Sequence, residues 1–160
     1  TANPKAIKAI KDADLIVVGP GNLYASLIPN FLVTGIGKAF AASKASKAYV
    51  ANLMNKHGHT DDFVVSDYVR TIERIIGKKN VFDSVVYNTK RPAQTLLRKY
   101  ADEGEPVVCG PECLKGDFAL IGANLLADTL AKTAKKDLLR RTLIRHDPEK
   151  LAHAILGILG

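Results

Sequence analysis

The feature that most constrains this chain is an apolar run, Leu15–Val18, that stops at Gly19-Pro20-Gly21. A short run rich in β-branched residues and bounded by glycine and proline predicts a buried strand that ends in a tight turn. In open α/β sheets, ligands bind at the carboxyl ends of the strands. The turn after Val18 is therefore the first candidate for a functional site.

The rest of the chain alternates between strand-like and helical segments. Strands are predicted at residues 48–53, 82–87, 107–108 and 118–121. Helices are predicted at residues 6–10, 36–43, 67–76 and 92–101, with a polar loop at 55–62. This alternation predicts an α/β fold in which helices cover both faces of the sheet. With 160 residues, 47% of them apolar, the chain is long enough for one domain spanning 1–160.

The last segment carries a clear helix start. Asp147 precedes Pro148, the order expected of a capping side chain followed by proline in the first helical turn. A short strand is predicted just before it, at residues 143–144. We expect the buried face of this helix to consist of Leu151, Ile155, Leu156 and Leu159.

Several classes of protein are not indicated. No apolar stretch approaches the roughly 20 residues that cross a bilayer, so no membrane partner is expected. The chain does not open on a basic and then apolar segment, so we expect a cytoplasmic protein rather than an exported one. The net charge of +7 permits anionic partners. The basic segment at 132–150 lacks interleaved aromatic residues, so nucleic acid is not an expected partner, and Lys132, Lys135 and Lys136 fit a solvated helix face.

The two cysteines do not form a recognised motif. Cys109 and Cys113 are separated by three residues, whereas a thioredoxin-type pair has two between them. Two thiols are also too few for a zinc site. We expect both to be unpaired and partly buried.

The turn after the first strand continues into a candidate ligand loop, Gly19-Pro20-Gly21-Asn22-Leu23-Tyr24-Ala25-Ser26. Glycines let the backbone approach a ligand, and amides at a following helix start favour phosphate. Asn22 and Ser26 could add side-chain hydrogen bonds. The dinucleotide fingerprint is absent, because Tyr24 replaces the third glycine. An ordinary strand-to-helix turn remains an equal alternative.

A second polar cluster follows the second predicted strand, with members His57, His59, Thr60, Asp61, Asp62, Ser66 and Asp67. Histidines and carboxylates can bind a divalent metal. His57 and His59 are two residues apart, however, which suits a loop better than one face of a helix. We therefore predict no metal site, and favour a solvated loop in which Ser66 or Asp67 caps the next helix.

Arg145 lies between the apolar pair at 143–144 and the helix capped by Asp147. A guanidinium near a helix N-terminus can bind phosphate through two parallel hydrogen bonds. A structural ion pair with a nearby carboxylate is about as well supported by the residues alone.

Taken together, these segments resemble one family, the gluconeogenesis factors, which are bacterial relatives of 2-phospho-L-lactate transferase. The resemblance covers roughly residues 6–156. It rests on the following residues in order: Ala13 to Tyr24, Ser26, Pro29, Asn30, Asn52-Leu53-Met54, Gly58, Thr60, Ser66-Asp67 and Arg145-His146-Asp147.

The resemblance implies a Rossmann-like, three-layer α/β/α fold with a mostly parallel sheet. It also implies a nucleotide pocket lined by Gly19, Pro20, Gly21, Asn22, Leu23, Tyr24, Ser26, Asn52, Tyr100 and Arg145. In the bacterial branch, the implied function is binding of UDP-sugars by a regulatory protein tied to gluconeogenic growth and cell shape. In the transferase branch, a phospholactyl group moves from a guanosine diphosphate donor to a deazaflavin, and Mg²⁺ is expected only in that enzymatic case. The family also implies a homodimer.

The chain departs from the family pattern in two places. The glycine-rich phosphate loop and acidic residues with which the family opens have no counterpart, so the chain resembles the carboxyl-terminal half, and the expected fold and pocket are incomplete without the other half. The second motif of the family reads Met-Thr-Gln-Pro-Gly-Glu-Thr. Here Asn55, Lys56, His57 and His59 replace its Thr, Gln, Pro and Glu. The absent glutamate leaves any acid or metal role at that position in doubt.

Overall fold

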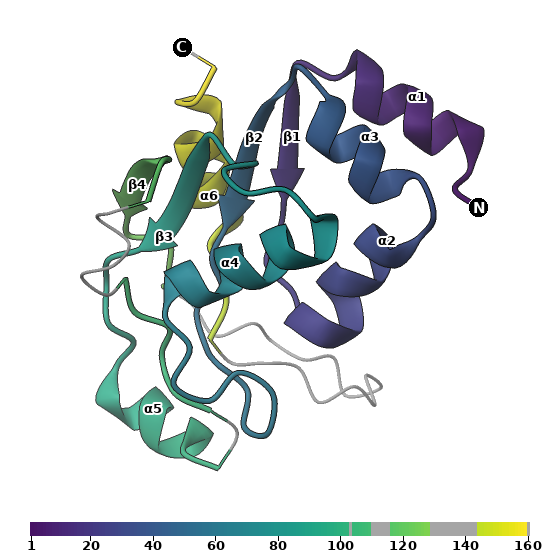
Figure 1. The fold of residues 1–160 in the computed structure, drawn as a ribbon. Helices are drawn as coiled ribbons and strands as arrows, with labels where there is room; N and C mark the ends of the chain where they lie inside the picture. Colours follow the sequence, from purple (N-terminus) through teal and green to yellow (C-terminus); the bar gives the residue numbers. More distant parts are fainter. Residues whose placement is uncertain (103, 110–115, 129–143, 160) are drawn as a thin grey trace, which may run out of the picture.

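Four strands form one parallel sheet whose order in space follows the chain, β1-β2-β3-β4. The computed structural model describes residues 1–102, 104–109, 116–128 and 144–159. The strands are β1 (Leu15–Val18), β2 (Ser46–Val50), β3 (Ser84–Asn88) and β4 (Ala119–Ala123). Because all four run the same way, their carboxyl ends meet at one edge, the lower one in Figure 1. The predicted parallel α/β fold is confirmed.

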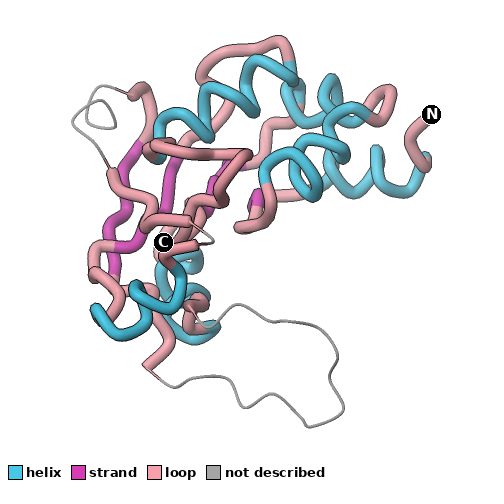
Figure 2. The backbone as a smooth tube through the Cα atoms, turned by 90° about the horizontal axis from the view of Figure 1, so that it is seen from below, coloured by secondary structure: helices cyan, strands magenta, loops and turns pink. Residues whose placement is uncertain are grey.

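Helices pack on both faces of this sheet, as Figures 1 and 2 show. They are α1 (Pro4–Asp12), the π-helical turn η1 (Leu23–Leu27), α2 (Ile28–Leu32), α3 (Ile36–Ala42), α4 (Val65–Ile76), α5 (Gln94–Tyr100) and α6 (Pro148–Leu156). Helices α2, α3 and α4 cover one face and α6 covers the other, while α5 lies beyond the carboxyl edge (Figure 1). The resulting three layers are those of a Rossmann-like fold.

The alternation of side chains along β2 and β3 builds both cores. Tyr49 and Val85 are fully buried against α4, where Ile72 is also fully buried. The neighbouring residues Val50 and Val86 point the other way and pack with α6. Full burial of one such aliphatic side chain stabilises the fold by about 1.5–3 kcal/mol. Strands β2 and β3 therefore hold in place the loops that begin at their carboxyl ends.

Two predicted burial patterns need correction. Strand β1 is buried mainly on one face: Ile16 and Val18 pack in the core, whereas Val17 is 38% exposed, because β1 lies at the edge of the described sheet. At the C-terminal end, Leu156, the last residue of α6, and Leu159, which lies beyond the helix, are 63% and 56% exposed. The buried stripe comprises Leu151, Ala154, Ile155 and Ile158. These positions follow helical spacing, and Gly157 ends the helix before Leu159 can continue it.

Two predicted strands are absent from the sheet. Residues 107–108 bond outside the sheet, to the loop after β2 and to the start of α4: Val107 N donates to Leu53 O at 3.1 Å, and Val65 N donates to Val108 O at 3.1 Å. Ile144 is a bend, and its predicted partner Leu143 lies outside the described residues. The isolated pairing in this segment is instead between His146 and Leu126.

One test of membrane association can be applied to the helices. Within the described residues, no single helix has the length and apolarity needed to cross a membrane. The two helical segments Leu23–Leu32 and Ile36–Ala42 meet the length and apolarity criteria only when they are taken together, and an 82° bend separates them.

Candidate functional site

The glycine loop is locked to the end of the neighbouring strand by one amide side chain. Asn52, just after β2, accepts a hydrogen bond from Gly21 N at 3.2 Å and donates one to Gly21 O at 2.8 Å. Asn22 caps the turn that follows, because its Oδ1 accepts from Ala25 N at 3.0 Å. Both asparagines were predicted to serve a ligand. The structure shows that they first shape the loop.

A cavity of about 720 Å³ opens beside this loop, at the carboxyl ends of β1 and β2. Its size falls in the range typical of small-molecule sites. Among the residues predicted to bind a nucleotide, the structure brings the following to its wall: Pro20, Gly21, Asn22, Asn52, Tyr100 and Arg145. Tyr100 and Arg145 are far from the loop in sequence, so only the fold could join them.

Four predicted residues lie outside the wall of this cavity: Gly19, Leu23, Tyr24 and Ser26. Leu23 begins η1 and is 1% exposed, so its side chain belongs to the core. Tyr24 and Ser26 are exposed. The Tyr24 ring meets the His59 ring edge-on, with 6.5 Å between the ring centroids.

The wall also contains residues that the resemblance did not assign to the pocket: Leu53, Met54, Asn55, Lys56, His57, Asp102, Ile144 and His146. Most of them come from the loop after β2. The sequence could have identified these loop residues, because they directly follow the candidate Asn52. Asp102 lies two residues after the predicted binding residue Tyr100, and His146 lies next to the predicted binding residue Arg145. Closeness in sequence to these residues could have identified both.

Cationic side chains dominate the charged part of the wall. Among the described residues, Lys56, His57 and Arg145 line it together with one carboxylate, that of Asp102. His146 adds no charge near neutral pH, because burial lowers the pKa of its imidazole despite a hydrogen bond to the Ala51 backbone. Such a wall favours an anionic ligand, and phosphate above all.

Arg145 is positioned by its backbone. Its carbonyl accepts from Ala127 N at 3.0 Å, and Asp147 N donates to Leu125 O at 2.8 Å. The Asp147 side chain then caps α6, accepting from Glu149 N and Lys150 N, as predicted. Arg145 also makes a further interaction within the protein.

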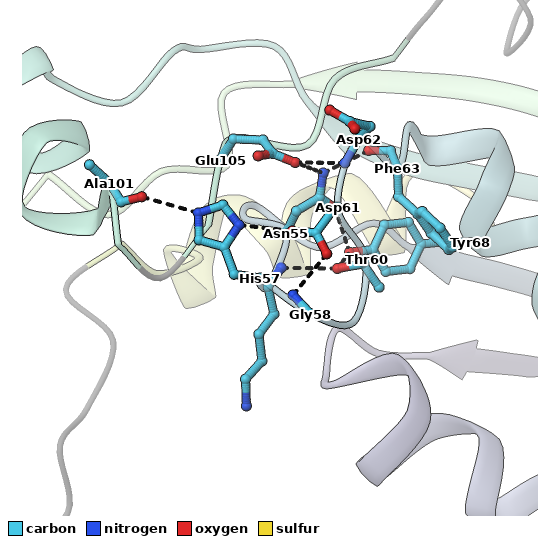
Figure 3. Close-up of polar contacts among 11 residues, drawn as sticks. Asn55, His57, Gly58, Thr60, Asp61, Asp62, Phe63, Tyr68, Ala101 and Glu105 are labelled. Carbon is cyan, nitrogen blue, oxygen red and sulfur yellow. Dashed lines mark hydrogen bonds and ion pairs between the residues drawn. The ribbon is translucent and has the colours of Figure 1, made fainter.

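The loop at 55–62 consists of exposed residues held by two buried polar side chains, Asn55 and Thr60 (Figure 3). Asn55 is 5% exposed; its amide donates to Phe63 O at 2.8 Å and to Glu105 Oε1 at 3.1 Å, and its Oδ1 accepts from Tyr68 at 2.7 Å. Thr60, 3% exposed, lies 3.1 Å from the same Tyr68 hydroxyl. The favoured solvated loop is therefore right for residues 56–59 and 61–62, which are exposed, and wrong for Asn55 and Thr60.

Three further polar residues of the cluster, His57, Asp61 and Asp67, make hydrogen bonds within it. His57 and Asp61 pair at 2.8 Å, and Asp61 Oδ2 accepts from Gly58 N at 2.8 Å. Asp67 accepts from Val64 N at 2.9 Å, so it caps α4 as predicted, from inside the first turn. Within the described residues, no group of three or more histidine, cysteine or acidic side chains could hold a metal ion.

A second cavity, of about 770 Å³, lies at the carboxyl end of β3 and shares Leu53 with the first. It is lined by Tyr87 to Pro92 and by Pro106 to Cys109. Cys109 is half-buried and packs against the main core, and Cys113 lies outside the described residues. The sequence analysis did not identify this cavity, because its lining carries no recognisable motif.

With this geometry in place, comparison with known proteins is informative. The profile of the family described as 2-phospho-L-lactate transferase CofD matches residues 1–125, more than half of the chain. This chain belongs to the CofD family. The predicted family relationship is confirmed.

Relatives with curated names show which CofD-family proteins this chain is similar to. A Nostoc sp. protein, named provisionally as a gluconeogenesis factor, is 40% identical over 99% of this chain and 33% of its own length. The gluconeogenesis factor of Bacillus subtilis is 33% identical over 98% of this chain and 46% of its own length. A crystal structure of a UPF0052-family protein from Bacillus halodurans superposes with a TM-score of 0.81 at 33% identity, covering 96% of this chain and 46% of that protein.

The chain thus spans about a third to a half of the length of the relatives it matches. This fits the prediction that it corresponds to one half of a larger CofD-family protein.

Proposed function

We propose that this chain provides the nucleotide-binding half of a regulatory protein that binds a UDP-sugar and is tied to gluconeogenic growth and cell shape. The gluconeogenesis-factor relatives support this branch of the CofD family. The observation that carries the proposal is the cavity of about 720 Å³ at the carboxyl ends of β1 and β2, with its cationic wall.

The wall divides by chemistry into two parts that suit a nucleoside diphosphate. Arg145 and Lys56 supply charged donors for phosphate oxygens. The Gly21 backbone, held by Asn52, allows close approach of the ligand. Leu53, Met54 and Ile144 add an apolar part on which a ribose or base can lie.

Titration calorimetry of the intact protein with a UDP-sugar tests the proposal. Saturable binding without turnover is the expected result, and the Arg145→Ala variant should bind more weakly. A titration that shows no binding of the UDP-sugar at millimolar concentration would contradict it. A guanosine diphosphate compound, titrated in parallel, reports which base the pocket prefers.

A second candidate function is transfer of a phosphate-containing group from a nucleotide diphosphate donor, which the family profile favours. Mg²⁺ would accompany such an enzyme. The described residues do not fit a magnesium site: among them, Asp102 supplies the only carboxylate of the cavity wall, which also contains Lys56, His57 and Arg145. Turnover of the donor by the intact protein would favour the enzyme over the regulator.

Three further expectations belong to this proposal. We propose that the protein is a homodimer, that it is cytoplasmic, and that it does not bind nucleic acid. Light scattering of the intact protein tests the first and fractionation of cells the second. Binding to nucleic acid that weakens steeply as salt rises would contradict the third.

A further inference from the structure

One histidine joins the loop at 55–62 to the end of α5 (Figure 3). His57 Nδ1 lies 2.8 Å from Asp61 Oδ1, and His57 Nε2 lies 3.1 Å from the backbone oxygen of Ala101. Ala101 directly follows the last residue of α5, so its carbonyl lies at the helix C-terminus. The two hydrogen bonds tie together segments that are 44 residues apart.

The partners of His57 determine its protonation state. A carboxylate and a backbone carbonyl are both acceptors, so each ring nitrogen must donate. Only the imidazolium carries a proton on both nitrogens, and a neutral imidazole can keep just one of the two bonds. The carbonyls at a helix C-terminus also carry partial negative charge, which favours a cation there.

Both segments joined by His57 form walls of the candidate pocket. Lys56 and His57 line it from the loop, and Tyr100 and Asp102, on either side of Ala101, line it from α5. The link therefore joins these two walls.

We propose that His57 is a positioning residue that, while doubly protonated, holds the two walls of the pocket together and so supports ligand binding. The inference rests on the proposed function, in that the pocket is taken to bind a nucleotide. It adds a pH dependence: ligand affinity falls as the proton leaves His57.

The surrounding charges decide the pH range. The hydrogen bond to Asp61, followed by that to Ala101, raises the pKa of His57 above its ordinary 6.5, and the charge of Glu105 acts in the same direction. The other charged side chains that line the same cavity are those of Lys56, Arg145 and Asp102. Because the pKa is raised, the link is complete below 6.5 and is lost as the pH rises through the raised pKa.

The link can be tested without any ligand, by NMR titration of the histidine ring protons in the intact protein. His57 should titrate above an ordinary histidine, and Asp61→Asn should move its pKa down. Amide hydrogen exchange near Tyr100 should accelerate, beyond its intrinsic pH dependence, as His57 loses its proton. A pKa at or below the ordinary value, or indifference of these amides, would overturn the link.

Titration with UDP as the probe, from pH 6 to pH 9, tests the effect on the pocket. Wild-type affinity should fall about three- to tenfold across the His57 titration, the size expected for one lost hydrogen bond. His57→Gln keeps one donor, so it should bind with the weaker affinity at every pH. The matched control is His59→Gln, in the same loop but outside the cavity wall, which should keep the wild-type slope.

The two experiments separate the two hypotheses. Absence of UDP binding at every pH would refute the proposed function while the ring titration still decides the link. Binding that does not change across the His57 titration, or an unchanged slope in His57→Gln, would refute the positioning role and leave the proposed function standing.

Discussion

The two loops that form the candidate pocket are held in place by different chemistry. The glycine loop at 19–22 is locked by the neutral amide of Asn52, through hydrogen bonds to the Gly21 backbone. The loop at 55–62 depends on the buried Asn55 at its base and on the charged pair of His57 and Asp61 at its tip. The first loop contains no group that titrates near neutral pH, whereas the tip of the second does. One side of the pocket is thus rigid across pH and the other is adjustable.

The largest expected effect is on the base of the second loop. Asn55→Ala removes the donor to Phe63 O and one of the two partners of the buried Tyr68 hydroxyl, which keeps Thr60, and an unsatisfied buried group costs about 1–3 kcal/mol. We expect a loss of about 2–4 kcal/mol in the free energy of unfolding, measured by urea denaturation. Asn22→Ala, which removes an exposed cap from the other loop, should cost only about 1 kcal/mol. Equal losses in the two variants would contradict the contrast between the loops.

The next effect concerns ligand affinity. Arg145→Ala should weaken nucleotide binding about 10–100-fold, because a charged hydrogen bond contributes roughly 1.5–3 kcal/mol. Arg145→Lys keeps the charge but not the planar guanidinium, so it should recover only part of that loss. Calorimetry beside thermal melts separates the roles. A lower melting temperature with unchanged affinity would assign Arg145 to structure.

Gly21→Val tests the rigid loop. A Cβ at Gly21 would lie 3.2 Å from Leu27 Cδ2, the end of a side chain that can shift by a few tenths of an ångström. We therefore expect binding to weaken more than stability, about tenfold in affinity against about 1 kcal/mol in unfolding free energy. Gly19→Ala is the control, because a Cβ there meets nothing within 4 Å. If Gly21→Val bound the nucleotide with wild-type affinity, the loop would be an ordinary turn with no role in binding.

The smallest effect is the pH dependence of stability at the loop tip. The His57 hydrogen bond lowers the pKa of Asp61 below its ordinary 3.8, so its contribution is present above that pH and lost as the pH falls through the lowered pKa. The His57 contribution is lost at the other end, as the pH rises through its raised pKa. Asp61→Asn should therefore lower the melting temperature slightly at pH 5.5 and not at pH 9, since both side chains are exposed to solvent. A melting-temperature difference between Asp61→Asn and the wild type that grows as the pH rises would contradict this prediction.

The sequence predicted those parts of the site that local rules govern. The run Leu15–Val18 and its glycine turn indicated the strand end, and Asp147 before Pro148 indicated the helix that fixes Arg145. Asp67 was correctly favoured as a cap. These features depend on residues within one turn or one strand, where backbone geometry and side-chain reach suffice.

Burial and partnership needed the tertiary structure. The periodicity of α6 did not distinguish Leu156 from Ile158, because the choice depends on where the sheet lies against the helix. Asn55 and Thr60 resembled a solvated polar loop until Tyr68 and Glu105 were brought to them from elsewhere in the chain. Hydrogen bonds over such separations leave no local pattern in the sequence.

The sequence alone determined the fold class, the family and the strand end beside which the cavity opens, because periodicity, turn chemistry and a series of ordered motifs are local features of the chain. Only the tertiary structure decided which distant side chains complete the pocket. It placed Tyr100, Asp102 and Arg145 around Asn52, and it placed Ala101 opposite His57. Two acceptors on one imidazole turn an ordinary loop histidine into a charged link, and that arrangement exists only after the sheet has brought α5 beside the loop.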